Sequence, residues 1–338
     1  MFDIVTIGGA TRDMTFLTDR GKVIETPEDL TSQRLLAFEY GAKIRSEDVR
    51  MNFGGGACNA AATFAKMGLN AAVVSRLGDD GNGRSIAENL RQRNISTDLI
   101  QIEAGKNSAF SFIVVDSAGK EGERVIFTHK GAANGLEIRP EEIKDTKWIY
   151  LTALGDDFED KLRKIGEAVR ESGGKLAWNP GETEILSGKE KLAEFMKFTY
   201  LLIINKDEAI ELVKSDSVSG LEGEDFNDIA KLIGVIKSWG VSNIVITDGK
   251  KGAYLLAGEE MLHSGAHVMR QTDTTGAGDA FGSGLVAGYI ISGDFEIALK
   301  FGILNSGGEV AEYGAESGIM TREEIESKLQ GVEIEKIK

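Results

Sequence analysis

Short segments that are apolar throughout alternate with amphipathic segments along most of the chain. Uniformly apolar strands are typical of parallel sheets whose two faces are both covered by helices. The six segments that fit this pattern best are residues 4–8, 71–75, 148–151, 175–178, 201–204 and 243–247. Their alternation with helices predicts βαβ units and an α/β fold with a doubly wound, mainly parallel sheet sandwiched by helices.

The segments between these apolar runs have the spacing of amphipathic helices, and two longer helices follow near the carboxyl end. The predicted helices are residues 57–67, 84–93, 157–171, 206–213, 225–239, 277–292, 295–313 and 322–329. In open sheets of this kind, ligands bind beyond the carboxyl ends of the strands. Functional residues are therefore expected directly after the predicted strands.

Two stretches do not follow this alternation. Residues 110–115 and 124–129 are β-rich and are joined by the polar segment 116–123, which predicts a β-hairpin. Residues 14–50 show no clear helical period and carry many charges. These stretches fit a small β-layer that stands off the main sheet, and they fit simple surface excursions equally well.

The charge balance excludes several common classes of partner. The chain has 39 basic and 54 acidic residues, a formal net charge of -15, which repels phosphodiester backbones and anionic lipid. A single cysteine, Cys58, excludes an internal disulfide. His263 and His267 lack the glutamate of a zinc-protease helix and are interpreted as surface or pocket-wall residues. No apolar run reaches the ~18 residues of a membrane helix, so we expect a cytoplasmic protein without nucleic-acid or membrane partners.

The most informative motif is DTTGAGDAF at residues 273–281, where a predicted apolar helix begins. Gly276, Ala277 and Gly278 allow a tight turn that exposes successive amides at the helix N-terminus, which attracts anions. Asp279 follows in the first turn, where a carboxylate can accept a hydroxyl proton while the amides hold a transferring phosphoryl group. Alternatively, the glycines cap the helix and Asp279 stabilises its dipole by about 0.3–1 kcal/mol. The sequence contains neither a P-loop nor a dinucleotide fingerprint.

Four motifs occur in order along the chain. They are a glycine-rich segment at 54–61 followed by LGDDG at 77–81, NKDE at 205–208, TDGKKG at 247–252, and DTTGAGDAF at 273–281. Together they resemble the motifs of the ribokinase-like (PfkB-type) carbohydrate kinases, over nearly the whole chain. The resemblance implies a kinase that transfers the γ-phosphate of ATP, in line, to a hydroxyl of a sugar or sugar derivative. Asp279 would be the general base, and the amides of Gly276, Ala277, Gly278 and Asp279 would form the anion hole.

The resemblance also implies binding roles for residues of the other motifs. For the acceptor these are Asp13, Gly54, Gly55, Gly56 and Asn59, and for the nucleotide they are Asn205, Thr247, Gly249, Gly252 and Asn305. Glu208 would hold Mg²⁺ through water, since this ion keeps several of its waters. Asp273 and Thr275, with carbonyls near Gly314 and Ser317, would belong to a loop that binds K⁺.

Some of these residues also have plainer interpretations. Without the resemblance, residues 54–56 form an ordinary loop-to-helix turn and Asp13 is a solvated loop residue. Glu208 is then a first-turn acid that favours the helix dipole. The sequence alone leaves both interpretations open.

By the same resemblance, the chain is one α/β core with a small β-sheet lid over the acceptor. The core is expected to comprise residues 1–12, 51–104 and 132–338, and the lid residues 13–50 and 105–131. Closure of the lid would exclude water from the transfer. The lid would also form the contact of a homodimer.

The acceptor is not determined by these motifs. Family members that prefer ribose tend to carry Asn where Thr11 stands, and residues 152–155 offer no acid until Asp156. No arginine soon follows Asn179, which argues against a phosphorylated acceptor. Both differences concern the acceptor side of the expected site.

Two alternatives remain. A nucleoside kinase of the same family would use aromatic side chains to stack on a base, and the candidates are Phe16, Phe38, Phe110 and Phe112. A non-catalytic sugar or nucleotide sensor would have a damaged base or anion hole. In this chain Gly276, Gly278 and Asp279 are all present.

Overall fold

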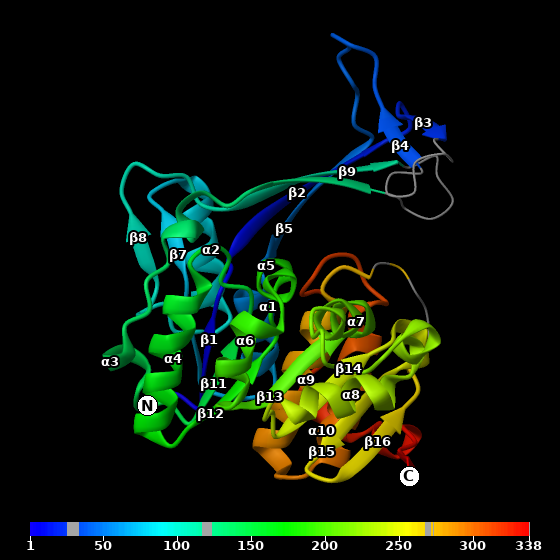
Figure 1. Cartoon of the computed structure of the whole chain (residues 1–338). Helices are drawn as coiled ribbons and strands as arrows, with labels where there is room; N and C mark the ends of the chain where they lie inside the picture. Colours follow the sequence, from blue (N-terminus) through cyan, green and yellow to red (C-terminus); the bar gives the residue numbers. More distant parts are fainter. Residues whose placement is uncertain (26–33, 117–123, 268–271, 273, 338) are drawn as a thin grey trace.

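The computed structural model describes residues 1–25, 34–116, 124–267, 272 and 274–337. A nine-stranded sheet runs through it in the order β17-β16-β15-β14-β13-β12-β11-β1-β6 (Figure 1). Its parallel part consists of β6 (Ala71–Val74), β1 (Ile4–Ile7), β11 (Trp148–Leu151), β12 (Lys175–Trp178), β13 (Thr199–Asn205) and β14 (Asn243–Thr247). These are the six strands predicted from the apolar segments, and the predicted α/β fold is confirmed.

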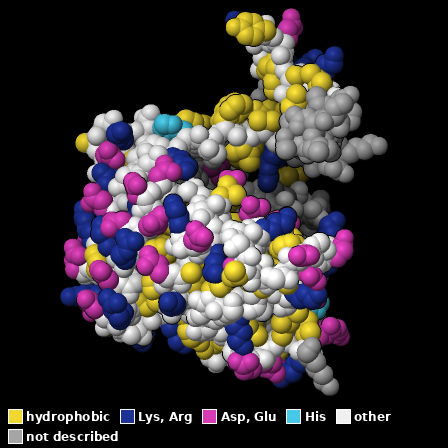
Figure 2. Space-filling model, viewed as in Figure 1, with side chains coloured by type: hydrophobic (Ala, Val, Ile, Leu, Met, Phe, Trp, Pro, Cys, Tyr) yellow, Lys and Arg dark blue, Asp and Glu magenta, His cyan; other side chains and the backbone are white. Residues whose placement is uncertain are grey.

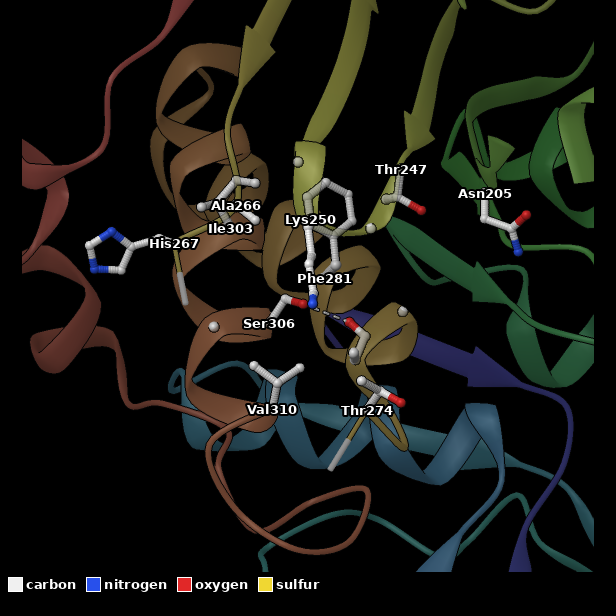
Figure 3. Close-up of a pocket in the computed structure, with 15 residues that line it drawn as sticks. Asn205, Thr247, Lys250, Ala266, His267, Thr274, Phe281, Ile303, Ser306 and Val310 are labelled. Atoms are coloured by element: carbon white, nitrogen blue, oxygen red, sulfur yellow. Dashed lines mark hydrogen bonds between the residues drawn. The ribbon is translucent and has the colours of Figure 1, made fainter. Parts of the chain in front are cut away.

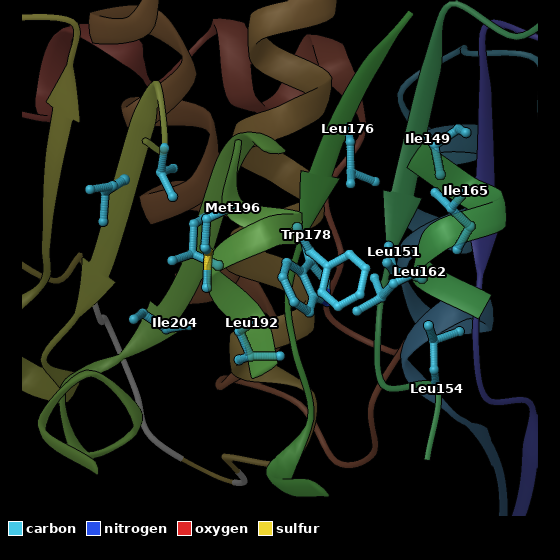
Figure 4. Close-up of a cluster of buried hydrophobic side chains, with 14 of the residues drawn as sticks. Ile149, Leu151, Leu154, Leu162, Ile165, Leu176, Trp178, Leu192, Met196 and Ile204 are labelled. Carbon is cyan, nitrogen blue, oxygen red and sulfur yellow. The ribbon is translucent and has the colours of Figure 1, made fainter. Parts of the chain in front are cut away.

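Helices cover both faces of this sheet, which is why its parallel strands are apolar throughout. One face carries α4 (Phe158–Ser172), α6 (Lys189–Met196), α7 (Lys206–Lys214) and α8 (Ile229–Ser238). The other carries α1 (Gly56–Lys66), α9 (Ala277–Ser292) and α10 (Phe295–Glu309). Trp178 lies fully buried on the first face, among Leu151, Leu162 and Leu192 (Figure 4). Tyr150 packs on the second face with Phe64.

The sheet has an antiparallel edge that the sequence did not predict. It consists of β15 (Ala253–Ala257), β16 (Glu260–Ser264) and β17 (Glu335–Ile337). β15 is apolar throughout and mostly buried, so it carries the same signal as the parallel strands, whereas β16 and β17 are short, partly exposed and mixed in polarity. Four further helices were predicted in part or not at all: α2 (Gly81–Gln92), α3 (Pro140–Ile143), α5 (Glu182–Ser187) and α11 (Arg322–Glu326).

The predicted helix boundaries differ most from the structure at two places, by four residues each. The helix expected at 225–239 begins at Ile229, because the Asp228 carboxylate caps it by accepting from the Ala230 and Lys231 amides. The helix expected at 295–313 ends at Glu309. Within the described residues, no helix combines the length and the hydropathy needed to cross a membrane.

A small four-stranded sheet stands off the main sheet, as predicted (Figure 1). Its order is β10 (Arg124–His129), β9 (Phe110–Asp116), β2 (Thr11–Thr18) and β5 (Asp48–Gly54). The expected pairing of 110–115 with 124–129 is confirmed as antiparallel, while residues 117–123 of the turn lie outside the described residues. A two-stranded ribbon, β3 (Lys22–Glu25) with β4 (Arg34–Ala37), extends from its tip, and β7 (Arg76–Gly78) pairs with β8 (Gln101–Glu103) near the core.

Candidate active site

The N-terminus of α9 is the predicted anion hole. Gly276 precedes the helix with φ = 78°, in the left-handed region, and a Cβ there would lie 2.7 Å from the Cα of Ala315. The first intrahelical bond runs from the Ala280 amide to the Gly276 carbonyl at 2.8 Å, so the Gly278 and Asp279 amides have no partner within the helix. Gly278 lines a cavity. The turn therefore directs amides at the positive end of a helix dipole toward that cavity.

The Asp279 carboxylate lies against the first turn of α1. Its Oδ2 accepts a hydrogen bond from Asn59 Nδ2 at 2.8 Å. Burial raises the pKa of Asp279, and the bond from Asn59 opposes this rise. Asn59 is itself buried, and its Oδ1 has no hydrogen-bond partner among the described residues. Asp279, the predicted base, is thus in direct contact with Asn59, which is predicted to bind the acceptor substrate. The two residues are 220 positions apart in the sequence.

The triple-glycine turn opens α1 and lies close to β2. Gly55 has φ = 93°, and a Cβ on it would lie 2.5 Å from the Gly9 carbonyl oxygen. A Cβ on Gly54 would lie 2.4 Å from Asp13 Oδ2. Asp13 is half-buried on β2, where burial raises its pKa although a hydrogen bond with Ser111 opposes the rise. Asp13 is therefore not a solvated loop residue, and it borders the same turn as Asn59.

A cavity of about 500 Å³ lies on the other side of the α9 N-terminus (Figure 3). Four elements and two loops supply its walls: the ends of β13 and β14, α9, α10 and the loops at 249–252 and 266–267. Its lining residues are Asn205, Thr247, Gly249, Lys250, Gly252, Ala266, His267, Thr274, Ala277, Gly278, Phe281, Ile303, Ser306, Gly307 and Val310. Four residues predicted to bind nucleotide, Asn205, Thr247, Gly249 and Gly252, are therefore brought to one cavity that the anion-hole turn also borders.

Asn305 does not join them, and its predicted nucleotide contact is wrong. It is fully buried between α9 and α10, where Nδ2 donates to the Ala280 carbonyl at 2.8 Å and Oδ1 accepts from the Met320 amide at 2.9 Å. These bonds satisfy the amide group and point it away from the cavity. The neighbouring positions Ile303 and Ser306 face the cavity instead.

Asn205 and Glu208 form a capping box at the start of α7. Asn205 Oδ1 accepts from the Glu208 amide at 2.9 Å, and Glu208 Oε2 accepts from the Asn205 amide at 2.8 Å. Burial raises the pKa of Glu208. Glu208 is thus a first-turn acid, as its plainer interpretation has it, and it also caps the helix, while a magnesium role remains a prediction. In the described part of the chain, no three His, Cys, Asp or Glu side chains gather into a metal-binding cluster.

The predicted cation loop is described only in part. Asp273 lies outside the described residues. The Thr275 hydroxyl accepts a hydrogen bond from Arg124 on β10, so the small sheet touches the segment that precedes α9. The segment after α10 packs on the same turn through Ala315.

Two glutamates that the sequence analysis did not single out hold this segment. Glu309, fully buried at the end of α10, accepts from the Gly318 amide at 3.0 Å, and burial raises its pKa to about 7. Glu316 is also buried and pairs with Arg93 at 2.8 Å. Most glutamates in a sequence are surface residues, so no local pattern distinguishes these two.

Most of the cavity wall was also missed. Its apolar side is formed by α10, and the lining positions there are 303, 306, 307 and 310. These positions have i, i+3, i+4 and i+7 spacing, which identifies one helix face. That signal was available, but the buried helix is apolar on most sides and hides it. The interpretation of His267 as a pocket-wall residue is confirmed.

Comparisons with known proteins agree with this arrangement. Residues 27–321 match the model of the pfkB family carbohydrate kinases. A ribokinase from Haemophilus influenzae is 26% identical over 288 residues, which cover 84% of this chain and 89% of that protein.

Solved structures show the same fold. Arabidopsis thaliana ribokinase complexed with ribose and ATP superposes with a TM-score of 0.79 at 20% identity, over 97% of this chain and 99% of that one. The Burkholderia thailandensis nucleoside kinase in complex with inosine gives a TM-score of 0.75 at 20% identity, over 97% and 98%. The main sheet, its helices and the small sheet thus form a ribokinase-like fold. The chain belongs to the pfkB family and is a carbohydrate kinase.

Proposed function

We propose that this kinase transfers the γ-phosphate of ATP to a hydroxyl of a sugar or sugar derivative, with Asp279 as general base. The observation that carries this proposal is the hydrogen bond between Asn59 and Asp279. It holds a carboxylate at the N-terminus of α9, between the cavity and the triple-glycine turn. Burial raises the pKa of this carboxyl, which makes its anion a better proton acceptor.

The acceptor binds on the triple-glycine turn, between Asp13 and Asn59. The Asp13 carboxylate and Asn59 Oδ1 can both accept hydrogen bonds from hydroxyl groups. The Asn59 oxygen is buried without a partner among the described residues, and a sugar hydroxyl would satisfy it. Gly54, Gly55 and Gly56 lack side chains, which allows Asp13, the Gly9 backbone and Thr152 to pack closely against this turn.

The nucleotide binds in the cavity, with its γ-phosphate at the N-terminus of α9. Asn205, Thr247 and Gly249 supply polar groups for the other phosphates where the strands end. The base packs against the apolar face of α10 around Ile303 and Val310. Glu208 would hold Mg²⁺ through water, and that ion would neutralise charge on the phosphates. A K⁺ ion near Asp273 and Thr275 would strengthen the anion hole electrostatically.

The transfer step follows from these positions. The Asp279 carboxylate takes the proton of the acceptor hydroxyl, and at the same time the hydroxyl oxygen forms a bond to the γ-phosphorus. The bond from the γ-phosphorus to the bridging oxygen breaks in line, and the amides of residues 276–279 hold the charge on the moving group. ADP leaves with the bridging oxygen. Closure of the small sheet, residues 13–50 and 105–131, over the core would keep water out.

We favour a sugar over a nucleoside as the acceptor. Two of the candidate base-stacking rings, Phe16 and Phe112, are half-buried and pack on each other within the small sheet, with centroids 4.7 Å apart. Thr152 follows β11 beside the triple-glycine turn and donates to the Ile7 carbonyl at 3.2 Å, whereas Asp156 is exposed. The absence of an acid at Thr152 supports an acceptor other than ribose.

We also propose a cytoplasmic homodimer that meets through the small sheet. Its edge strand β10 exposes Val125, Ile126 and Phe127 by 37, 47 and 59%. Hydrophobic side chains gather on this part of the molecule in Figure 2, and such a patch favours association. Sedimentation as a monomer at micromolar concentration would reject the dimer.

A panel of sugars, sugar derivatives and nucleosides in an ATP-consumption assay tests the proposed function. We expect turnover with a sugar or sugar derivative. Turnover with nucleosides alone would establish the alternative acceptor class. Binding of sugar or nucleotide without turnover across the panel would indicate a sensor and would reject Asp279 as a catalytic residue.

A further inference from the structure

Three lysines lie near the carboxyl ends of β13 and β14, and their partners differ. Lys206 and Lys251 both pair with the Asp248 carboxylate, at 3.7 and 3.3 Å. For Lys250, none of the carboxylates in the described ranges lies within ion-pairing distance. Asp248 thus compensates two of the three cations, and Lys250 keeps its charge available to a ligand.

Lys250 is also the lysine that borders the nucleotide cavity. Figure 3 shows its side chain on the loop after β14, among the residues that line this cavity. Among the described lining residues it is the one Lys or Arg, and no Asp or Glu lines the cavity with it. In a chain with a formal charge of -15, this places a cation where the surface elsewhere would repel an anion.

We propose that Lys250 is a donor-binding residue that pairs with the non-transferred phosphates of the nucleotide. The inference deepens the proposed function and rests on it. The γ-phosphate lies at the α9 turn and the base on α10, so the intervening phosphates pass the loop that carries Gly249 and Lys250. An ammonium group forms charge-assisted hydrogen bonds with phosphate oxygens. Lys250 contributes nothing to acceptor binding.

Calorimetric titration with adenosine, AMP and ADP tests this pairing without requiring turnover. The variants are Lys250→Ala, Lys250→Arg and the matched control Lys251→Ala, whose side chain is 69% exposed and does not line the cavity. We expect Lys250→Ala to weaken ADP binding by about 10-fold and to leave adenosine binding unchanged. Lys250→Arg and Lys251→Ala should bind ADP within about 2-fold of the unaltered protein.

The titrations also distinguish a failure of the Lys250 pairing from a failure of the proposed function. An equal loss for adenosine and ADP would overturn the pairing, because it would place Lys250 on the base. Unchanged ADP binding by Lys250→Ala, while the unaltered protein binds ADP, would overturn this inference and leave the proposed function intact. Failure of the unaltered protein to bind any adenine nucleotide would overturn both.

Discussion

The two sides of the α9 N-terminus have opposite chemistry. The proposed acceptor side, defined by Asp13, residues 54–56, Asn59 and Asp279, contains two carboxyl groups whose pKa values are raised by burial. The proposed donor side is the cavity of about 500 Å³, whose described lining contains no carboxylate and a single lysine. One side is thus rich in hydrogen-bond acceptors, and the other is rich in amides and carries a cation.

This difference matches what each substrate presents. A sugar offers hydroxyl donors, which carboxylate and amide oxygens bind. A nucleotide offers phosphate oxygens, which helix amides and ammonium groups bind. α9 serves both sides, because the Asp279 side chain contacts Asn59 while the amides of its first turn border the cavity. If this account is correct, substitutions on one side should leave the other substrate's binding nearly unchanged.

The largest effect is expected for Asp279→Asn. An amide cannot take the hydroxyl proton, so kcat should fall on the order of 10²–10⁴-fold. ADP affinity should stay within a few-fold, since the proposed phosphate ligands are backbone amides that this substitution leaves in place. Steady-state rates and ADP titration measure both quantities, and Asp156→Asn, at an exposed position, is the control. Turnover at the unaltered rate would exclude Asp279 as the base.

The next effect is expected for Asp13→Asn. The change removes a charged acceptor from the sugar hydroxyls, and the KM for the acceptor should rise about 10–100-fold. The KM for ATP should not change, which is the reverse of the pattern expected for Lys250→Ala. Kinetics with each substrate varied in turn distinguish the two patterns. A rise in the KM for ATP with Asp13→Asn would show that the two sides are not separate.

The smallest effect on catalysis is expected for Glu309→Gln. This substitution should instead change how the free energy of unfolding depends on pH. Burial raises the pKa of Glu309 to about 7 from 4.5, so the unfolded chain loses this proton first as pH rises. The folded state is therefore progressively destabilised between about pH 4.5 and 7, and the loss is complete above that window. Glutamine carries no such proton and should remove up to about 3 kcal/mol of this pH dependence.

Urea unfolding of the unaltered protein and of Glu309→Gln at pH 4.5 and pH 8 measures this difference. The two free energies of unfolding should diverge at the higher pH in favour of the variant. Equal pH dependence in both proteins would show that Glu309 titrates normally in the folded state.

Much of the fold was predictable because its signals are local. The six parallel strands are apolar throughout, and their helices carry the matching period, so both follow from sequence pattern. That Asn205 and Thr247 lie together at one cavity was also predictable, because parallel strands end at one edge of the sheet.

What the sequence did not reveal depends on side-chain direction. Asn305 lies on the same helix as the cavity-lining Ser306. The packing of α9 on α10 directs the Asn305 side-chain amide toward Ala280 instead of the cavity. The charge available on Lys250 depends on Asp248 pairing with two other lysines. Which of the three lysines pair with Asp248 depends on their positions in the folded protein, and residue spacing in the sequence does not predict it.

The most direct test of the account is a crystal structure with a non-hydrolysable ATP analogue and the acceptor that the panel identifies. We expect the reacting hydroxyl within about 2.6–3.2 Å of the Asp279 carboxylate, with the γ-phosphate on the amides of α9. A hydroxyl that contacts a different base, or a γ-phosphate bound away from the α9 N-terminus, would contradict the proposed mechanism.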